Sequence, residues 1–266
     1  MTVPPWQRRI QRAQELANQY SFAAEILTYY VHVARFQGGL QERVATAMPR
    51  SASPSSFQIG LSPTEVEYLS SQFDSFLTVP ESHGPKALAE LGRELRGRGK
   101  NFWAELLTTA WEAHTPSTAQ GLLAYAFLQP YAELLQSRAE PKTVSTAHAL
   151  CPFCNRKPGL GVLRQMGDGG ARSMVCSFCL AEWEFRRIVC PGCGEENDKA
   201  LPVYTAKEFH AIRVECCDTC KTYIKSIDLT KDGRAEPLVD ELAAAPLDLW
   251  AREHGYAKLQ CNLLGM

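Results

Sequence analysis

The sequence has no surplus of either charge. Its 266 residues include 28 lysines and arginines against 29 aspartates and glutamates, a formal net charge of −1. The balance holds along the chain, since residues 1–148 have 13 basic and 13 acidic residues and the remainder has 15 and 16. A surface for nucleic acid or anionic membranes needs a basic excess, so the composition argues against both kinds of partner.

Long apolar runs are also absent. No stretch approaches the roughly 18 to 20 apolar residues that a membrane-spanning helix needs. The first nine residues lack the apolar core of a secretory signal. We therefore expect a cytoplasmic protein without membrane insertion. The hydrophobic content of 45% is nevertheless typical of a globular chain with a sizeable core.

Cysteines are concentrated in one stretch. Eight of the ten form Cys-x-x-Cys pairs. The pairs are Cys151 with Cys154, Cys176 with Cys179, Cys190 with Cys193, and Cys217 with Cys220. A two-residue gap lets a tight turn direct both sulfurs at one centre, and two pairs complete a tetrahedral thiolate site. In a reducing compartment such pairs are more often metal ligands than disulfides, so the sequence predicts two metal sites of four cysteines each.

The spacing of the pairs indicates which of them cooperate. Twenty-one residues separate the first pair from the second and twenty-three the third from the fourth, but only ten separate the second from the third. The longer gaps accommodate a β-hairpin, so we predict two ribbons in tandem, each with its own metal. Interleaved ligation, first pair with third and second with fourth, is compatible with the spacing and stays open. Zinc and iron both suit such sites, so the metal is undecided.

The two ribbon halves resemble each other. They start thirty-nine residues apart with Cys-Pro-x-Cys, and each places an aromatic residue, Trp183 or Tyr223, just after its last cysteine. With Phe153 and Phe178, these aromatics are expected to shield the metals. Hairpins are expected from strands at residues 162–166 and 172–175, and from strands at 202–204 and 210–214.

Two cysteines remain outside the pairs. Cys216 directly precedes Cys217, but only Cys217 keeps the two-residue gap to Cys220. Cys216 is therefore expected to be a spare thiol or a neighbour of the second site. Cys261 has no partner in the sequence and is expected to be a small buried hydrophobic residue.

The first part of the chain shows helical periodicity and no convincing strand alternation. Helices are expected at residues 6–17, 21–36, 40–47, 63–79, 86–95, 102–114 and 117–136. The clearest start is Ser62-Pro63-Thr64-Glu65, which combines an N-cap, a first-turn proline and an acid at the third position. Gly38-Gly39 is expected to end the second helix, and Pro130 to kink the last.

Several segments of this first part are expected to be irregular, and none contains a catalytic constellation. Residues 49–56 read as an exposed linker and residues 96–100 as a basic loop. The histidines are expected on the surface or in the core, not as ligands; they include His32, His83, His114 and His148.

Together these patterns predict an α+β protein with three parts. An all-α domain covers residues 1–140, a first ribbon with four cysteine ligands covers 148–187, and a second covers 188–266. A hinge is expected near residues 140–143, and the last part includes a C-terminal helix at 239–254 and an apolar tail.

With these motifs in place, the chain resembles the formate dehydrogenase accessory protein family FdhE. The residues that carry the resemblance are the four knuckles, Leu128 to Glu133, Trp183, Gly194, Tyr223 to Lys225, Leu247 to Leu249, and Gly255-Tyr256. The resemblance implies a helical domain followed by two rubredoxin-like ribbons. It also implies a non-catalytic factor that binds the dehydrogenase catalytic subunit during assembly and carries iron. Cys216, the short tail and the linker at 49–56 depart from the family pattern and leave the exact partner open.

Two other functions compete with this one. A nucleic-acid-binding zinc ribbon would use Arg164, Arg172, Arg186 and Arg187, but Glu182, Glu184, Glu195 and Glu196 lie among them. A thiol–disulfide enzyme would need a reactive thiolate at a helix N-terminus, and knuckles followed by strands do not provide one.

Overall fold

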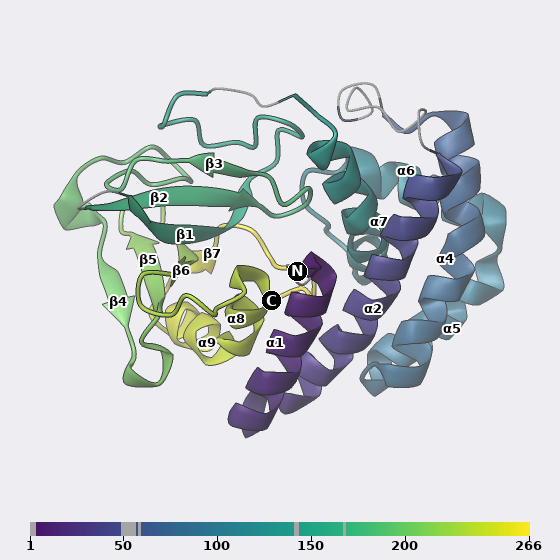
Figure 1. Ribbon diagram of the computed structural model, residues 1–266, viewed down its shortest axis with the longest axis horizontal. Helices are drawn as coiled ribbons and strands as arrows, with labels where there is room; N and C mark the ends of the chain where they lie inside the picture. Colours follow the sequence, from purple (N-terminus) through teal and green to yellow (C-terminus); the bar gives the residue numbers. More distant parts are fainter. Residues whose placement is uncertain (1–3, 49–56, 58–59, 141–143, 167–168) are drawn as a thin grey trace.

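The protein consists of a helical body beside a β-sheet (Figure 1). The computed structural model describes residues 4–48, 57, 60–140, 144–166 and 169–266. Most of the expected linker at 49–56 and hinge at 140–143 lies outside the described residues. The helices of the body are α1 Pro5–Gln19, α2 Ala24–Ala47, α4 Pro63–His83, α5 Lys86–Arg98, α6 Lys100–Glu112 and α7 Ala119–Ser137. No helix among the described residues is long and apolar enough to span a membrane.

Helix α4 starts where the sequence predicts, directly after the N-cap residue Ser62. The Ser62 side chain accepts a hydrogen bond from the Glu65 backbone at 3.4 Å, and the Glu65 carboxylate accepts one from the Ser62 backbone at 2.6 Å. This reciprocal capping box satisfies two backbone donors that the first helical turn leaves open. Tyr131 of α7 also donates to Glu65, so the capping residue ties two helices together.

The predicted end of the second helix at Gly38-Gly39 is wrong. Helix α2 continues to Ala47 and includes the segment expected as a separate short helix. Gly38 faces α1, and a Cβ atom there would lie 3.2 Å from Cγ of Trp6. The small residue permits a close contact between two helices, while buried Leu40 and Val44 anchor the continuation.

Helix α7 contains Pro130 in its interior, where the missing N–H leaves the carbonyl of Ala126 without its helical partner. Gln37 of α2 donates to that carbonyl at 2.6 Å, and Gln41 donates to the Pro130 carbonyl at 3.1 Å. Two glutamines of a neighbouring helix therefore satisfy the interrupted backbone. The kink expected at Pro130 stays a prediction.

The basic loop expected at residues 96–100 is mostly helical. Helix α5 continues through Arg98 and α6 starts at Lys100, with only Gly99 between them at a φ of 79°. Arg96 forms ion pairs with Asp74 at 3.1 Å and with Glu81 at 2.9 Å. Its side chain therefore links α5 to α4 and does not belong to a free basic turn.

A seven-stranded sheet forms the second layer (Figure 1). Its strands are β1 Pro158–Met166, β2 Gly169–Cys176, β3 Glu182–Glu184, β4 Val203–Thr205, β5 Ile212–Cys217, β6 Thr222–Asp228 and β7 Ala257–Lys258. The order is β3-β2-β1-β6-β5-β4, with β7 added beside β6. The expected hairpins are present, because β1 pairs with β2 and β4 with β5 in antiparallel register.

The two ribbons join in this one sheet. Strand β1 of the first half pairs in parallel with β6 of the second, Gly161 opposite Ser226. A Cβ at Gly161 would collide with Oγ of Ser226, so the glycine permits the close approach of the two strands. The mixed arrangement of helices and sheet confirms the α+β class.

The predicted C-terminal helix is two helices. They are α8 Pro237–Ala243 and α9 Ala245–Glu253, separated at Ala244. Pro246 explains the break, because it has no N–H to donate to a carbonyl of α8 and is favoured in the first turn of a new helix. Arg12 of α1 bonds to Asp240 of α8 at 2.6 Å, which fastens this pair of helices to the helical body.

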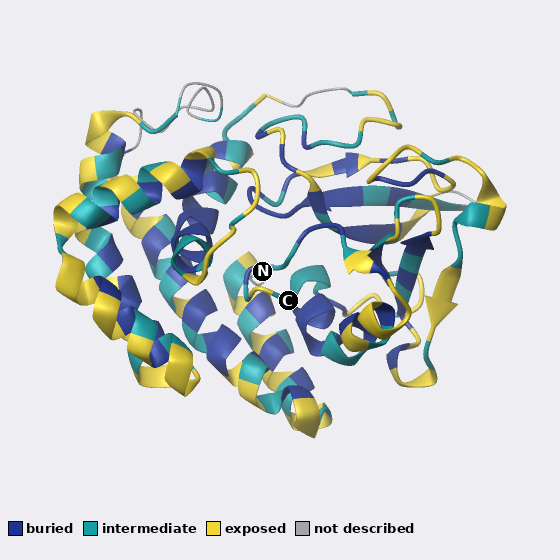
Figure 2. Ribbon diagram, turned by 180° about the vertical axis from the view of Figure 1, so that it is seen from behind, coloured by how far each residue is buried: buried dark blue, intermediate teal, exposed yellow. Residues whose placement is uncertain are grey.

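The core has two main parts (Figure 2). The larger cluster runs from the helices into the first ribbon, so Leu27, Phe127 and Phe178 share one buried region with Cys151 and Cys179. A second cluster lies between the sheet and α9, whereas the buried apolar residues of α8 belong to the first cluster. The first cysteine ribbon is therefore packed into the helical body, and the second packs mainly on α9.

Candidate metal centres

The eight paired cysteines gather in two groups of four. The sulfurs of Cys151, Cys154, Cys176 and Cys179 lie within 4.8 Å of one another, and so do those of Cys190, Cys193, Cys217 and Cys220. The sulfurs are thus grouped in the tandem order and not in the interleaved one. All ten cysteines of the chain are free thiols.

The distances between sulfurs fit a tetrahedral ion. A metal–sulfur bond of about 2.3 Å gives sulfur–sulfur edges of about 3.8 Å in a regular tetrahedron. In the second group, Cys190 to Cys220 and Cys193 to Cys217 both measure 3.7 Å. In the first group, Cys151 to Cys179 and Cys154 to Cys176 are shorter, at 3.5 Å and 3.3 Å. Each group could hold one metal ion, and a bound divalent ion would cross-link two distant turns.

Each knuckle closes with a left-handed residue directly after its second cysteine. These residues are Asn155 at φ 58°, Leu180 at 58°, Gly194 at 78° and Lys221 at 55°. The three that are not glycine are unfavourable there by about 1–2 kcal/mol each. Four repeats of one strained turn show that both halves build their thiol pairs in the same way. In the sequence only Gly194 hints at this geometry.

The helical body covers the first group. The Phe178 ring lies 4.4 Å from that of Tyr125 and 5.3 Å from that of Trp111. Tyr125 also shares a hydrogen bond of 3.1 Å with Ser177, and Gln129 donates to the Ser177 carbonyl at 3.3 Å. All four cysteines of this group are buried. A metal in this group would be screened from solvent by α6 and α7.

Arg156 is a site residue that the sequence analysis missed. It is 4% exposed, donates to the carbonyls of Ala113 and Trp111, and places its guanidinium 4.1 Å from the Phe178 ring centre. A buried cation next to a four-thiol group offsets part of the negative charge of thiolates. The sign of this role in the sequence was that Arg156 lies two residues after the second cysteine of the first pair, Cys154.

The second group is more open. Cys190 and Cys217 are buried, Cys220 is half-buried and Cys193 is exposed. The Cys220 sulfur lies 3.0 Å from the hydroxyl of Thr222, and the Gly192 backbone donates to the Cys190 sulfur at 3.3 Å. Solvent therefore reaches one side of this group, and it has no helical cover comparable with that of the first.

Thiol acidity differs within each group. Hydrogen bonds, first with Cys151, lower the pKa of Cys154 well below its ordinary value, while burial raises the pKa of Cys176 and Cys179 well above it. In the second group burial raises the pKa of Cys190 to about 12. Burial also opposes ionisation of Cys220, but hydrogen bonds from Thr222 bring its pKa down to about 7. Four clustered thiols need a cation before all can ionise, and a coordinated ion supplies it.

The two unpaired cysteines lie outside both groups. Cys216 is buried in the cluster between the sheet and α9, and burial raises its pKa to about 12. This position agrees with the expectation that Cys216 is a neighbour of the second thiol group and not one of its four members. Cys261 is only half-buried, so its expected full burial is wrong. Leu259, Gln260 and Leu263 on either side of it are buried, but Cys261 itself lines two cavities that leave its side chain partly accessible.

The predicted aromatic and histidine residues take varied places. Phe178 and Trp183 are buried in the cluster that contains the first thiol group, while Phe153 is half-buried against it. Tyr223 instead faces the C-terminal helices. Two of the histidines, His32 of α2 and His83 of α4, stack with their ring centres 3.5 Å apart.

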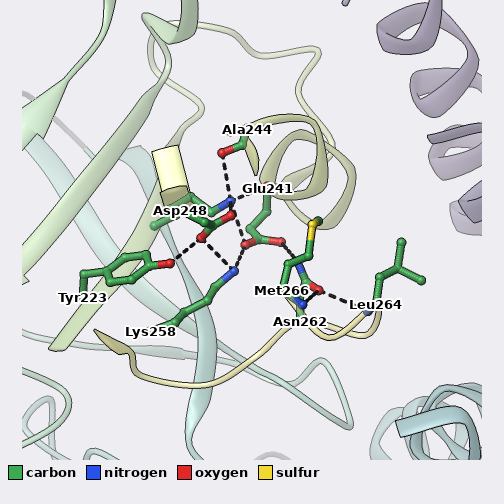
Figure 3. A network of polar contacts seen from close by, with 9 residues as sticks. Tyr223, Glu241, Ala244, Asp248, Lys258, Asn262, Leu264 and Met266 are labelled. Atoms are coloured by element: carbon green, nitrogen blue, oxygen red, sulfur yellow. Dashed lines mark hydrogen bonds and ion pairs between the residues drawn. The ribbon is translucent and has the colours of Figure 1, made fainter. Parts of the chain in front are cut away.

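A buried network of charges fixes the C-terminal helices to the sheet beside the second group (Figure 3). Lys225 is fully buried and contacts Asp248 at 2.7 Å and Glu241 at 3.0 Å. Lys258 contacts Glu241 at 2.5 Å, and Tyr223 donates to Asp248 at 2.7 Å. Two lysines and two carboxylates balance each other. In the sequence Lys225 stands out only within the motif Tyr223 to Lys225, because its charged partners come from distant segments.

Opposite charges in this network favour the ionised forms of Glu241 and Lys258. Burial disfavours the charged form of Glu241, but Lys225 and Lys258 outweigh it and lower its pKa to about 2. Burial likewise opposes ionisation of Lys258, yet Glu241 and Asp248 raise its pKa. Asn262 of the tail adds a hydrogen bond of 2.9 Å to Glu241. The tail is therefore part of the support of the second ribbon.

Fold and site together define a protein whose sheet carries two groups of four cysteines, each able to hold a metal ion, beside a helical body. Comparison with known proteins agrees. Residues 150–187 match the family model of the FdhE central domain and residues 188–264 that of the FdhE C-terminal domain.

Relatives and a solved structure extend the match to most of the chain. A protein FdhE homolog of Aquifex aeolicus (strain VF5) is 30% identical over 77% of this chain and 73% of its own length. A homolog of Pseudomonas putida is 33% identical over 69% of this chain and 60% of its own length. The crystal structure of the FdhE protein from Pseudomonas aeruginosa superposes with a TM-score of 0.70 at 25% identity, covering 97% of this chain and 95% of that one. The chain belongs to the FdhE family, which confirms the resemblance drawn from its motifs.

Proposed function

We propose that this chain is a non-catalytic accessory factor for formate dehydrogenase, which binds the catalytic subunit during assembly. Membership of the FdhE family supports this role. The observation that carries it is that both four-sulfur groups are complete and lie within the two segments that match the family's domain models.

Each group is proposed to hold one iron or zinc ion. The proposed ligands are Cys151, Cys154, Cys176 and Cys179 in the first site and Cys190, Cys193, Cys217 and Cys220 in the second. We also propose residues 1–140, 148–187 and 188–266 as the units of the chain. The ions would supply cross-links to ribbons that are too small to bury a sufficient core of their own. The ribbons and the helical body together then provide a docking surface for a client protein.

The competing functions have less support. Arg164, Arg172 and Arg186 each form an ion pair with a glutamate, so most of the arginines available for nucleic acid are neutralised. A thiol–disulfide enzyme needs a reactive pair at a helix N-terminus. All four pairs lie in turns, and two of them, Cys176 with Cys179 and Cys217 with Cys220, begin at the last residue of a strand.

Co-purification tests the proposed function. A tagged catalytic subunit of formate dehydrogenase, expressed in the native host, is expected to retain this chain. Replacing Cys151 and Cys154 by serine opens the first site and should reduce both metal content and recovery. Cys216→Ser is the matched control and should leave both unchanged, because Cys216 lies outside the groups. Absence of the wild-type chain from the purified subunit would contradict the proposal.

A further inference from the structure

A groove crosses the sheet where the two ribbons meet. It encloses about 350 Å³, and the connector between the ribbons forms one wall. Residues of β1, β2, β4, β5 and β6 contribute to the other walls, so both halves of the sheet take part. The lining residues that matter below are Arg172, Arg187, Ile188, Val203, Arg213 and Glu215. The neighbours of Glu215 along β5, Val214 and Cys216, belong to the buried cluster beneath α9. Because side chains alternate along a strand, the side chain of Glu215 points to the opposite face of the sheet, where the groove lies.

The groove has a positive excess. Its lining includes three arginines and one glutamate. Arg172 pairs with Glu215 at 2.5 Å, and Arg213 pairs with Asp228 at 2.6 Å. Arg187 is exposed and forms no ion pair with any residue that the structure describes. An occupant with an acidic side chain would therefore complement the groove.

Arg172 supplies a second, independent sign of an occupant. Its side chain is 3% exposed, and its Nη1 donates to the carbonyls of Arg186 at 2.9 Å and Val189 at 3.2 Å. Its Nε is buried and has no hydrogen-bond partner within the described part of the chain. An unsatisfied buried donor costs about 1–3 kcal/mol. An acceptor on a bound molecule would remove that penalty.

Strand β4 borders the groove at the edge of the sheet. The Cys216 backbone donates to the Pro202 carbonyl at 2.9 Å, which makes the Val203–Glu215 pair a non-hydrogen-bonded one. The backbone N–H and C=O of Val203 therefore point out of the sheet. Val203 is 53% exposed and Tyr204 38% exposed.

The two edges of the sheet differ in their protection. The opposite edge, β3, carries Glu182 and Glu184, and charged residues discourage the addition of another strand. Strand β4 has no charged residue, and Ile188 on the rim of the groove is 54% exposed. An uncharged edge strand beside exposed apolar residues and a free arginine suits an extended peptide.

We propose that the groove binds an extended segment of the client dehydrogenase subunit, which adds to β4 as a further strand and places an acidic side chain against Arg172 and Arg187. This inference rests on the proposed function and names the surface that performs it. Main-chain hydrogen bonds to Val203 provide affinity in such strand addition, and side-chain contacts provide selectivity. Ile188 contacts an apolar side chain next to the acidic one.

Three substitutions in the full-length, metal-loaded protein test the groove. Arg187→Glu reverses the free charge, Ile188→Ser removes the apolar rim, and Val203→Pro removes an N–H that β5 does not use. Binding of the purified catalytic subunit is measured by biolayer interferometry. Each variant is expected to bind about tenfold more weakly or worse. Raising the salt concentration from about 50 to about 500 mM should weaken wild type but not Arg187→Glu, because in that variant salt screens a repulsion between two carboxylates.

Matched controls lie elsewhere on the surface. Arg93→Glu makes the same charge change on exposed α5, and Met166→Ser removes an apolar side chain that is 61% exposed. Both should bind the subunit like wild type. Thermal unfolding and metal content of every variant are measured first. If one of the three groove variants loses its metals, the test rests on the other two.

The outcomes separate the two claims. Wild-type affinity in the groove variants would overturn the groove as the docking site while leaving the accessory role intact. Equal weakening by Arg187→Glu and Arg93→Glu would also overturn it, because the effect would then be one of net charge. Failure of the wild-type chain to bind the subunit at all would overturn the proposed function, and the named occupant of the groove with it.

Discussion

Exposure to a strong chelator should remove metal from the two sites at different rates. The first thiol group is buried beneath α6 and α7, with Cys179 at 0% and Cys176 at 1% exposure. The second group has Cys193 exposed and Cys220 half-buried. A chelator can reach the second ion directly, whereas the first is reached only after its cover opens.

The size of the difference follows from that cover. Phe178 is fully buried against Tyr125 and Trp111, and exposing one such side chain costs about 1.5–3 kcal/mol. Each 1.4 kcal/mol corresponds to a factor of about ten in population. Release from the first site should therefore be roughly tenfold to hundredfold slower than release from the second.

A coloured chelator in a stopped-flow instrument gives the assay. Two phases of equal amplitude are expected, one ion in each. Cys193→Ser should remove the fast phase, Cys179→Ser the slow one, and Cys216→Ser neither. Phe178→Ala should accelerate only the slow phase. A single phase containing both ions, or loss of the slow phase in Cys193→Ser, would refute the assignment of sites and their unequal cover.

Three predictions concern stability. Lys225→Met leaves two buried carboxylates short of a cation and should lower the free energy of unfolding in urea by about 3–5 kcal/mol, whereas exposed Lys221→Met should change it little. The pKa of Glu241 is about 2 in the folded protein, below its ordinary value of 4.5. The stability that ionised Glu241 contributes is therefore present above about pH 4.5 and is lost as the pH falls towards 2. The difference in unfolding free energy between wild type and Glu241→Gln should shrink over that range, and a difference that stays constant would contradict this linkage. Gln37→Leu leaves the buried carbonyl of Ala126 without a hydrogen bond and should lower the free energy of unfolding by about 1–3 kcal/mol. Adding Pro130→Ala restores a backbone N–H for that carbonyl, so the double mutant should recover part of the loss, whereas strictly additive effects of the two substitutions would contradict the explanation.

Features encoded within a few residues were predictable from sequence. The Cys-x-x-Cys pairs and the Ser62 capping box depend on neighbours in the chain, so spacing alone located them. The wrong predictions concern residues that have more than one use. Gly38 serves a close helix contact and not a helix end, and Pro246 breaks a stretch whose apolar periodicity is continuous.

Features that depend on distant segments could not be predicted. The parallel pairing of β1 with β6 joins the two ribbons, and its only local trace is Gly161. The network around Lys225 draws its partners from α8, α9 and the tail. No periodicity or motif marks such contacts, because each is set by how the chain returns to the sheet.

X-ray absorption spectroscopy combined with metal analysis of anaerobically purified protein tests the central claim most directly. Two ions per chain are expected, each with four sulfur neighbours at about 2.3 Å. Fewer than two ions, oxygen or nitrogen ligands in place of sulfur, or cysteines oxidised to disulfides would contradict it.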